Sequence, residues 1–275
     1  MEPLNATDLS APTEMPAASP YLERRVGRLH LTVRTDWNSP AFIAFLSGEL
    51  NAPRALEKIE RIPSSVNTAV YRIEAFRRPV YLKVFLYNHW RHAMTAPFAA
   101  SKGHRAWTAG RWMDARGFLT PPLLALGEER RLGFIRKSFF VTEEVAGVRL
   151  SKLLEQKELL DCYSGGRLFE RIGKLLGAFH REGMIHGDLN VTNFLVRSVE
   201  PLGPPEIYFL DNEGCREADP TRAAAMALDD LRSFFGRQVR SLPIDAQREI
   251  LEGYLSEYPA MRASRPMLEQ GLRIG

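Results

Sequence analysis

The sequence is poor in cysteine, with Cys162 and Cys215 as its two thiols. Two cysteines so far apart cannot build a disulfide framework, and without a Cys-x-x-Cys pair they do not outline a zinc site. We therefore expect both thiols to be reduced and the protein not to be secreted.

Long apolar runs are also missing. The longest, such as Phe-Ile-Ala-Phe at residues 42–45, fall far short of the roughly 20 residues that a membrane-spanning helix needs. The first twenty residues contain neither Lys nor Arg and have no continuous apolar region, so they do not fit a signal peptide. Their Pro, Ala and Ser content predicts a disordered tail over residues 1–20. The expected location is cytoplasmic.

The chain has 275 residues, of which 45% are hydrophobic and 25% are charged. This balance is typical of a globular protein with one lobe or two closely packed lobes, and it excludes collagen-like and wholly disordered classes. The net charge is +4. A basic surface suits an acidic substrate, an anionic lipid or nucleic acid, and charge does not choose among them.

Residues 21–146 have mainly the pattern of strands. Residues 70–76 and 80–86 alternate apolar and polar side chains on either side of a short turn and predict a hairpin. A helix is expected over about 99–116, closed by Gly117. Further strands are predicted at 28–33, 123–128 and 138–144. The expected structure is a small antiparallel sheet with one helix.

The pattern changes at Gly147. Apolar residues then recur at helical spacing, as in Leu168, Ile172, Leu176 and Phe179, which share one face. We therefore predict an α+β protein in which residues 21–146 form an N-terminal lobe and residues 147–275 form a compact, mainly helical C-terminal lobe.

Four polar positions stand out against this framework. His186-Gly187-Asp188 follows the end of a predicted helix, and Asn193 comes five residues after Asp188. Asp211 ends an apolar strand eighteen residues beyond Asn193, and Lys83 lies in the middle of the strand Val-Tyr-Leu-Lys-Val-Phe. In order and spacing these residues resemble the catalytic core of the protein-kinase-like phosphotransferases. The resemblance implies a two-lobed protein-kinase-like fold.

That resemblance also implies roles, with ATP and Mg²⁺ as cofactors. Asp188 would orient the acceptor hydroxyl and receive its proton, and Lys83 would neutralise the nucleotide phosphates. Asn193 and Asp211 would supply the oxygen ligands that magnesium prefers. His186 would be a buried structural support of the catalytic loop rather than a base.

Other segments extend the resemblance. Phe-Val-Thr-Glu-Glu-Val-Ala-Gly at 140–147 is similar to the linker between kinase lobes. It would place Thr142 behind the adenine and offer it the backbone carbonyl of Glu143 and the amide of Val145. Asp230 is the residue we expect to support the catalytic loop from a later helix. The segment 64–73 lies where the nucleotide-covering loop belongs, and in place of glycine it offers turns and polar contacts from Ser64, Ser65 and Asn67.

The spacing of these residues limits which branches of the superfamily the sequence can resemble. Asp230 comes only nineteen positions after Asp211, and no Ala-Pro-Glu follows, so a regulated protein kinase does not fit. Compact branches remain: lipopolysaccharide-core kinases, RIO-type kinases, and aminoglycoside or choline phosphotransferases. The basic helix, Thr120-Pro121-Pro122 with Gly127, and Val-Thr-Glu-Glu-Val-Ala-Gly are most similar to the lipopolysaccharide kinase (Kdo/WaaP) family. That family implies phosphorylation of a sugar hydroxyl in the lipid-anchored inner core.

Three departures favour an alternative, a pseudokinase that binds nucleotide and acts as a scaffold for a partner protein. The helix glutamate that pairs with the strand lysine in active kinases corresponds to Ala106 here, so we expect Lys83 to pair with Asp211 instead. The metal motif is Asp211-Asn212-Glu213, in which Glu213 is a further candidate ligand. The loop at 64–73 has no glycine. A third interpretation is a RIO-like protein kinase, for which the basic charge is the only additional support.

Basic and aromatic residues are interleaved over residues 87–116, with Trp90, Trp107 and Trp112 among several arginines. This composition suits phosphorylated sugars or peripheral contact with the cytoplasmic face of the inner membrane. The interpretation favoured here is that the tryptophans pack the helix against the sheet while the arginines are solvated. The expected partner is a lipid-linked core oligosaccharide, and no nucleic acid is expected.

Overall fold

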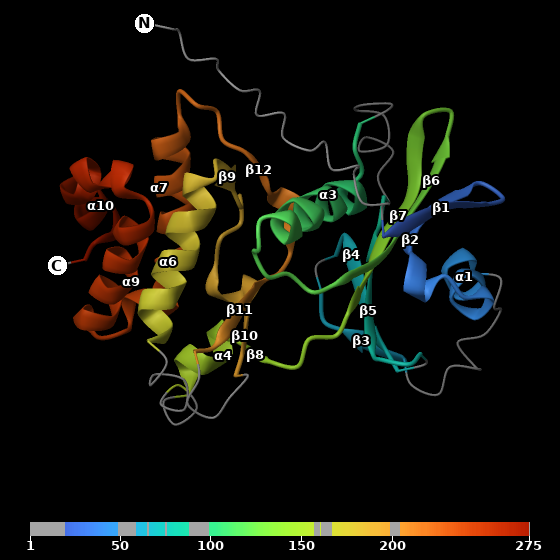
Figure 1. Ribbon diagram of the computed structural model, residues 1–275, viewed down its shortest axis with the longest axis horizontal. Helices are drawn as coiled ribbons and strands as arrows, with labels where there is room; N and C mark the ends of the chain where they lie inside the picture. Colours follow the sequence, from blue (N-terminus) through green and yellow to red (C-terminus); the bar gives the residue numbers. More distant parts are fainter. Residues whose placement is uncertain are drawn as a thin grey trace, which may run out of the picture.

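The computed structural model describes residues 20–48, 59–64, 66–74, 76–87, 99–156, 160, 167–198 and 204–274. The tail predicted over residues 1–20 therefore lies, apart from Pro20, outside the described residues, and so do Ser65, Trp90 and Cys162. The chain forms two parts that lie side by side (Figure 1). One is built on a sheet and is called the N-lobe below, and the other is mainly helical and is called the C-lobe.

The N-lobe is built on a seven-stranded antiparallel sheet in the order β1-β2-β6-β7-β5-β4-β3. Its elements are β1 (Tyr21–Val26), β2 (Leu29–Arg34), η1 (Thr35–Trp37), α1 (Pro40–Ser47), β3 (Ile59–Ile62), β4 (Thr68–Ile73), β5 (Val80–Phe85), α3 (Lys102–Ala115), β6 (Leu123–Arg131) and β7 (Phe134–Glu143). The predicted hairpin is β4 and β5, paired from Thr68 opposite Phe85 to Ile73 opposite Val80.

One N-lobe helix was not predicted from the sequence. Helix α1 begins after Ser39, whose hydroxyl accepts a hydrogen bond from the Phe42 amide, and ends at Gly48 with a positive φ of 74°. Phe42 is buried against Trp37, with ring centroids 5.2 Å apart. The short apolar run at 42–45 therefore belongs to a helix that packs into the N-lobe core.

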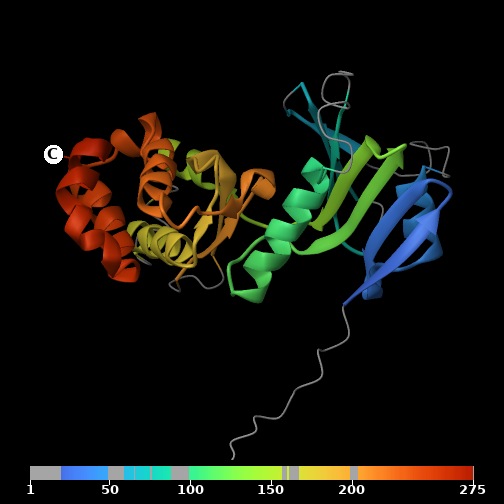
Figure 2. The same ribbon diagram turned by 90° about the horizontal axis from the view of Figure 1, so that it is seen from above.

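Helix α3 follows the sequence prediction closely. Ser101 caps its start by accepting a hydrogen bond from the His104 amide at 2.9 Å, and Gly117 follows its end with a φ of 75°. It packs on β6 and β7 and also contacts the C-lobe turn η3 (Asn212–Gly214), so it lies between the lobes in both views (Figures 1 and 2). Trp107 and Trp112 are packed rather than solvated, Trp107 against Tyr21 and Trp112 against Phe118. The interpretation is confirmed for Trp107, which packs the helix on the sheet, and is wrong for Trp112, which packs on Phe118 and Phe179 of the C-lobe core.

The C-lobe joins short strands to a group of helices, as predicted. Its elements besides η3 are β8 (Val148–Arg149), α4 (Leu150–Glu155), α6 (Leu168–Arg181), β9 (Met184–Ile185), η2 (Val191–Asn193), β10 (Phe194–Arg197), β11 (Glu206–Phe209), β12 (Arg216–Glu217), α7 (Ala223–Phe234), α8 (Arg237–Arg240), α9 (Ile244–Glu257), η4 (Pro259–Ser264) and α10 (Arg265–Leu272). None of the described helices combines the length and apolar composition needed to cross a bilayer. The predicted boundary between residues 146 and 147 stays a prediction.

Helices α6 and α9 of the C-lobe pack closely against each other. Leu168, Ile172, Leu176 and Phe179 are all buried on the α6 face that the periodicity predicted. Gly173 and Gly253 allow the two backbones to meet, because a Cβ at either position would lie within 2.3 Å of a carbonyl oxygen of the other helix. Helix α6 is followed by Gly183, which has a φ of 76° and precedes the segment that carries His186 and Asp188.

Candidate active site

A cavity of about 570 Å³ lies between the lobes. It receives side chains from β4, β5, the segment after β7, the loop after β9 and the turn η3, which are far apart in the sequence. Among its lining residues are Ser64, Lys83, Thr142, Glu143, Val145, Asp188, Asn193, Asp211 and Glu213. The fold thus brings together nine of the thirteen residues that the sequence marked as candidates.

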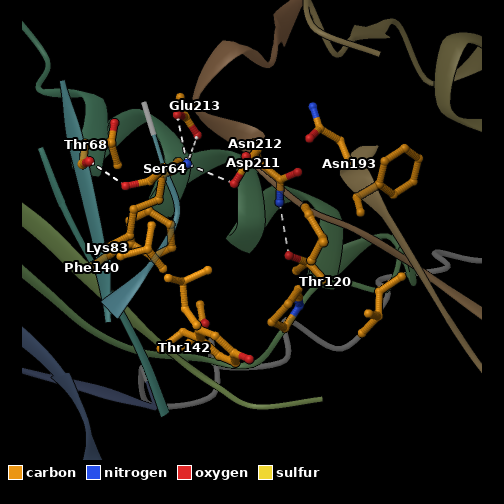
Figure 3. A pocket seen from close by; sticks show the side chains of 18 of the residues that line it. Ser64, Thr68, Lys83, Thr120, Phe140, Thr142, Asn193, Asp211, Asn212 and Glu213 are labelled. Atoms are coloured by element: carbon orange, nitrogen blue, oxygen red, sulfur yellow. Dashed lines mark hydrogen bonds and ion pairs between the residues drawn. The ribbon is translucent and has the colours of Figure 1, made fainter. Parts of the chain in front are cut away.

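Lys83 reaches across the cavity from β5 to the C-lobe. Its Nζ lies 2.8 Å from Asp211 Oδ1 and 2.9 and 3.0 Å from the two carboxylate oxygens of Glu213 (Figure 3). Burial on its own would lower the pKa of Lys83, but the charges and hydrogen bonds of the two carboxylates outweigh it and raise the pKa. Lys83 is therefore a fixed cation, and the expectation that it pairs with Asp211 is confirmed.

Asp188 is exposed to the cavity on the C-lobe side and is held by two amides. Its Oδ1 accepts a hydrogen bond from Asn190 Nδ2 at 3.0 Å, and its Oδ2 accepts one from Asn193 Nδ2 at 3.2 Å. The same Asn193 nitrogen donates to the Asp188 carbonyl at 2.9 Å. Two donors thus orient a solvent-facing carboxylate, which is what a group that accepts a proton from a bound hydroxyl requires.

Backbone geometry aims Asp211 into the cavity. Its φ of 56° is in the left-handed region, which a non-glycine residue seldom adopts and which is commonest at functional sites. The next residue holds the turn in place, because Asn212 Nδ2 donates to Thr120 Oγ1 of the N-lobe at 3.0 Å (Figure 3). Asp211 keeps about half of its side chain exposed to the cavity.

A second layer of buried groups supports the loop that carries Asp188. The Asp230 carboxylate on α7 accepts hydrogen bonds from the amides of His186 and Gly187, and it lies 3.4 Å from the buried His180 ring. His186 is fully buried, stacks on Phe209 and donates from Nε2 to the Leu210 carbonyl at 3.2 Å. His186 and Asp230 therefore lie behind the cavity wall, and neither is among the residues that line the cavity.

The segment after β7 is anchored to the sheet by ion pairs. Arg72 makes a two-pronged contact with Glu144, at 2.7 and 2.8 Å, and Arg78 pairs with the side chain of Glu143 at 2.5 Å. These contacts turn both acidic side chains toward the sheet. Thr142, Glu143 and Val145 line the cavity, and Thr142 is buried.

The predicted nucleotide-covering segment is only partly brought to the cavity. Ser64 lines it and donates its hydroxyl to the Thr68 carbonyl at 2.7 Å, closing the turn before β4 (Figure 3). Asn67 is not among the lining residues, and its carbonyl instead accepts a hydrogen bond from the Leu86 amide at 2.9 Å. Ser65 lies outside the described residues.

Sequence reasoning missed several residues of this site. Thr120 and Arg149 also line the cavity, and Arg149 donates to the Thr192 carbonyl at 2.8 Å. Glu213 was predicted as a metal ligand, whereas both of its carboxylate oxygens contact Lys83. A sequence separation of 130 residues hides this contact, and no local pattern indicates it.

The donor set fits a magnesium ion that is shared with phosphates. In the described ranges, no group of three or more His, Cys, Asp or Glu side chains is arranged to hold a metal ion. The cavity nevertheless offers the half-exposed carboxylate of Asp211 and the side-chain carbonyl of Asn193, whose nitrogen is committed to Asp188. Magnesium needs few protein ligands when substrate phosphates and water complete its octahedron.

Two known proteins are similar to this chain. A solved chain described as WaaP in complex with acyl carrier protein has a similar fold, with a TM-score of 0.61 and 20% identity over 88% of this chain and 96% of that chain. The KEOPS complex subunit Bud32 of Pyrococcus abyssi is 29% identical over 86 residues, which is 31% of this chain and 34% of that subunit. The chain thus matches about a third of the length of this curated relative.

The fold shown by the WaaP likeness is the two-lobed protein-kinase-like fold, as predicted. Residues 58–254, well over half of the chain and including Lys83, Asp188 and Asp211, match the model of one sequence family. On this match the chain belongs to the lipopolysaccharide kinase (Kdo/WaaP) family.

Proposed function

We propose that this kinase transfers the γ-phosphoryl group of ATP to a sugar hydroxyl of the lipopolysaccharide inner core. The observation that carries the proposal is the placement of Asp188, Lys83 and Asp211 on the walls of one interlobe cavity in a chain of this family. Phosphoryl transfer depends on positioning and on neutralising charge, and these three side chains offer an oriented carboxylate, a fixed cation and a half-exposed acid.

In the proposed reaction Asp188 accepts the proton of the acceptor hydroxyl as its oxygen bonds to the γ-phosphorus. The bond to the bridging oxygen of ADP breaks, and ADP leaves. Lys83 faces the α and β phosphates, and the backbone of residues 143–145 contacts the adenine next to Thr142. Magnesium, when bound by Asp211 and Asn193, supplies further neutralisation of the phosphate charge.

The proposed substrate is a lipid-linked core oligosaccharide, and the proposed place of action is the cytoplasmic face of the inner membrane, by peripheral contact. Support for this substrate comes from the family alone. The basic residues of α3 are compatible with an anionic glycolipid surface, since His104, Arg105 and Arg111 are exposed along it.

The pseudokinase alternative rests on Ala106, which leaves α3 without the usual acid. The contacts of Lys83 weaken that argument, because the lysine already has two carboxylate partners. A scaffold that only binds nucleotide would have no need of a carboxylate oriented like that of Asp188.

A turnover assay tests the proposal. ATP consumption is measured with and without purified core oligosaccharide, in the wild-type protein and in Asp188→Asn. The expected result is turnover that requires the oligosaccharide and falls at least about a thousandfold in the variant, while ATP affinity stays nearly unchanged. ATP binding without turnover on any acceptor would instead indicate the pseudokinase, and phosphate on protein would indicate the RIO-like reading.

A further inference from the structure

Helix α3 brings no acid to the lysine of the cavity. Ala106 is buried and lines the same cavity as Lys83, and the single acid of α3 is the exposed Asp114 near the C-terminal end of the helix. A buried ammonium nevertheless needs a carboxylate partner, because its desolvation is otherwise uncompensated. The partner must therefore come from another element.

Resting on the proposed function, we propose that Glu213 is the positioning residue for Lys83 and takes the place of the missing acid on α3. Glu213 contacts the ammonium with both oxygens, at 2.9 and 3.0 Å, whereas Asp211 uses Oδ1 alone. Its side chain is also the more protected of the two, at 24% exposure against 52% for Asp211. The protected, two-oxygen partner is the one that holds the lysine.

Asp211 and Glu213 therefore have different roles. Asp211 keeps its Oδ2 free of Lys83 and exposes half of its side chain to the cavity, so it can turn toward a metal ion without releasing the lysine from Glu213. Both carboxylate oxygens of Glu213 lie within 3.0 Å of the Lys83 Nζ. This assignment replaces the expectation that Glu213 is itself a metal ligand.

Arg105 links α3 to the same turn. Its Nε donates to the Glu213 carbonyl at 3.2 Å, and α3 packs on η3 directly. The residue before Ala106 therefore holds the backbone of Glu213, while the Glu213 side chain holds the lysine. The helix contributes to the position of Lys83 through this turn rather than through an acid of its own.

One consequence concerns lobe closure. Lys83 belongs to β5 of the N-lobe and Glu213 to η3 of the C-lobe, so the pair forms only when the lobes are together. An acid on α3 would instead keep the pair inside the N-lobe. Positioning of the lysine and closure of the cavity are thus a single event in this chain.

The test compares Glu213→Gln, Ala106→Glu and the double variant. The first readout is the rate at which an amine-reactive reagent modifies Lys83 in the protein without nucleotide, followed by peptide mass spectrometry. Because a paired ammonium resists modification, Glu213→Gln should raise this rate about tenfold, and adding Ala106→Glu should return it to within about threefold of wild type. The turnover number should fall about tenfold and recover in the same way, and Ala106→Glu alone should change turnover little or slow it.

Two matched controls test whether the effects depend on the acid partner of Lys83. Thr108→Glu adds an acid to the exposed face of α3 and should not rescue Glu213→Gln, and Glu217→Gln removes an exposed acid of β12 and should change neither readout. The midpoint of thermal unfolding is measured for each variant, and Glu213→Asp replaces Glu213→Gln if the latter does not fold.

Two outcomes would overturn the proposal. One is an unchanged modification rate in Glu213→Gln. The other is a higher magnesium requirement for nucleotide binding that Ala106→Glu does not correct, since that pattern belongs to a metal ligand. Lysine modification needs no acceptor, so a protein without sugar kinase activity would refute the proposed function and still leave this test decisive.

Discussion

Asp230 holds the backbone of His186 by a hydrogen bond of 2.6 Å from the His186 amide to its Oδ2. Its other oxygen accepts from the Gly187 amide at 3.0 Å, and its neighbour on α7, Asp229, points into solvent with 71% of its side chain exposed. Burial on its own would raise the pKa of Asp230, but hydrogen bonds from His180 and from the two amides outweigh it and lower the pKa. Two adjacent acids thus have unlike environments.

This contrast gives a stability prediction. Asp230→Ala should lower the free energy of unfolding by about 3 kcal/mol, because the amides of His186 and Gly187 and the buried His180 ring lose their acceptor. Asp229→Ala is the matched control and should stay within about 0.5 kcal/mol of wild type. Denaturant titration measures both, and equal effects would mean that Asp230 does not support the loop.

The crossing of α6 and α9 gives a second prediction. A Cβ at Gly173 would lie 2.0 Å from the Ile250 carbonyl oxygen, which is backbone and cannot turn aside. Gly173→Ala should therefore cost about 3 kcal/mol of stability by forcing the helices apart. At Gly271, in α10, the nearest atoms are the ends of flexible side chains at 3.4 Å. Gly271→Ala should be neutral or add up to about 1 kcal/mol, and a comparable loss at both sites would contradict the packing argument.

The third prediction concerns pH. Burial lowers the pKa of His186 in the folded protein, whereas in the unfolded chain this histidine titrates near about 6.5. Below its unfolded-state pKa this histidine binds a proton in the unfolded chain but not in the folded protein. The contribution of neutral His186 to stability is therefore fully present above the unfolded-state pKa and is lost as the pH falls toward the lowered folded-state pKa. The free energy of unfolding should therefore drop more between pH 7.5 and 5.5 in wild type than in His186→Gln. Parallel curves would remove this histidine as the cause.

The order and spacing of polar residues were sufficient to predict the fold class and much of the cavity. Lys83, Asp188 and Asp211 could be found because each lies at a fixed place relative to a strand or helix end, and such places are set by local pattern. Helix α1 was missed because its apolar residues find their partners Trp37 and Phe76 only in three dimensions.

The contacts of Glu213 could not be predicted for a different reason. They depend on the left-handed backbone of Asp211 and on the hydrogen bond from Asn212 to Thr120, which together set the direction of the turn. Neither has a sequence signature in a motif without glycine. The sequence could show that the acid on α3 was missing, but not which residue replaced it.

Asp211 supplies the last prediction, which concerns the metal. Its replacement by Asn keeps the shape of the side chain but removes the negative charge, and magnesium strongly prefers a charged oxygen ligand. Asp211→Asn should therefore raise the magnesium concentration needed for half-maximal nucleotide binding by about tenfold or more. Binding without magnesium should change much less, because Glu213 still holds Lys83 with two oxygens. Asp219→Asn, at an exposed turn outside the cavity, is the matched control. Calorimetry with and without magnesium measures both constants, and an unchanged magnesium requirement in Asp211→Asn would place the metal elsewhere.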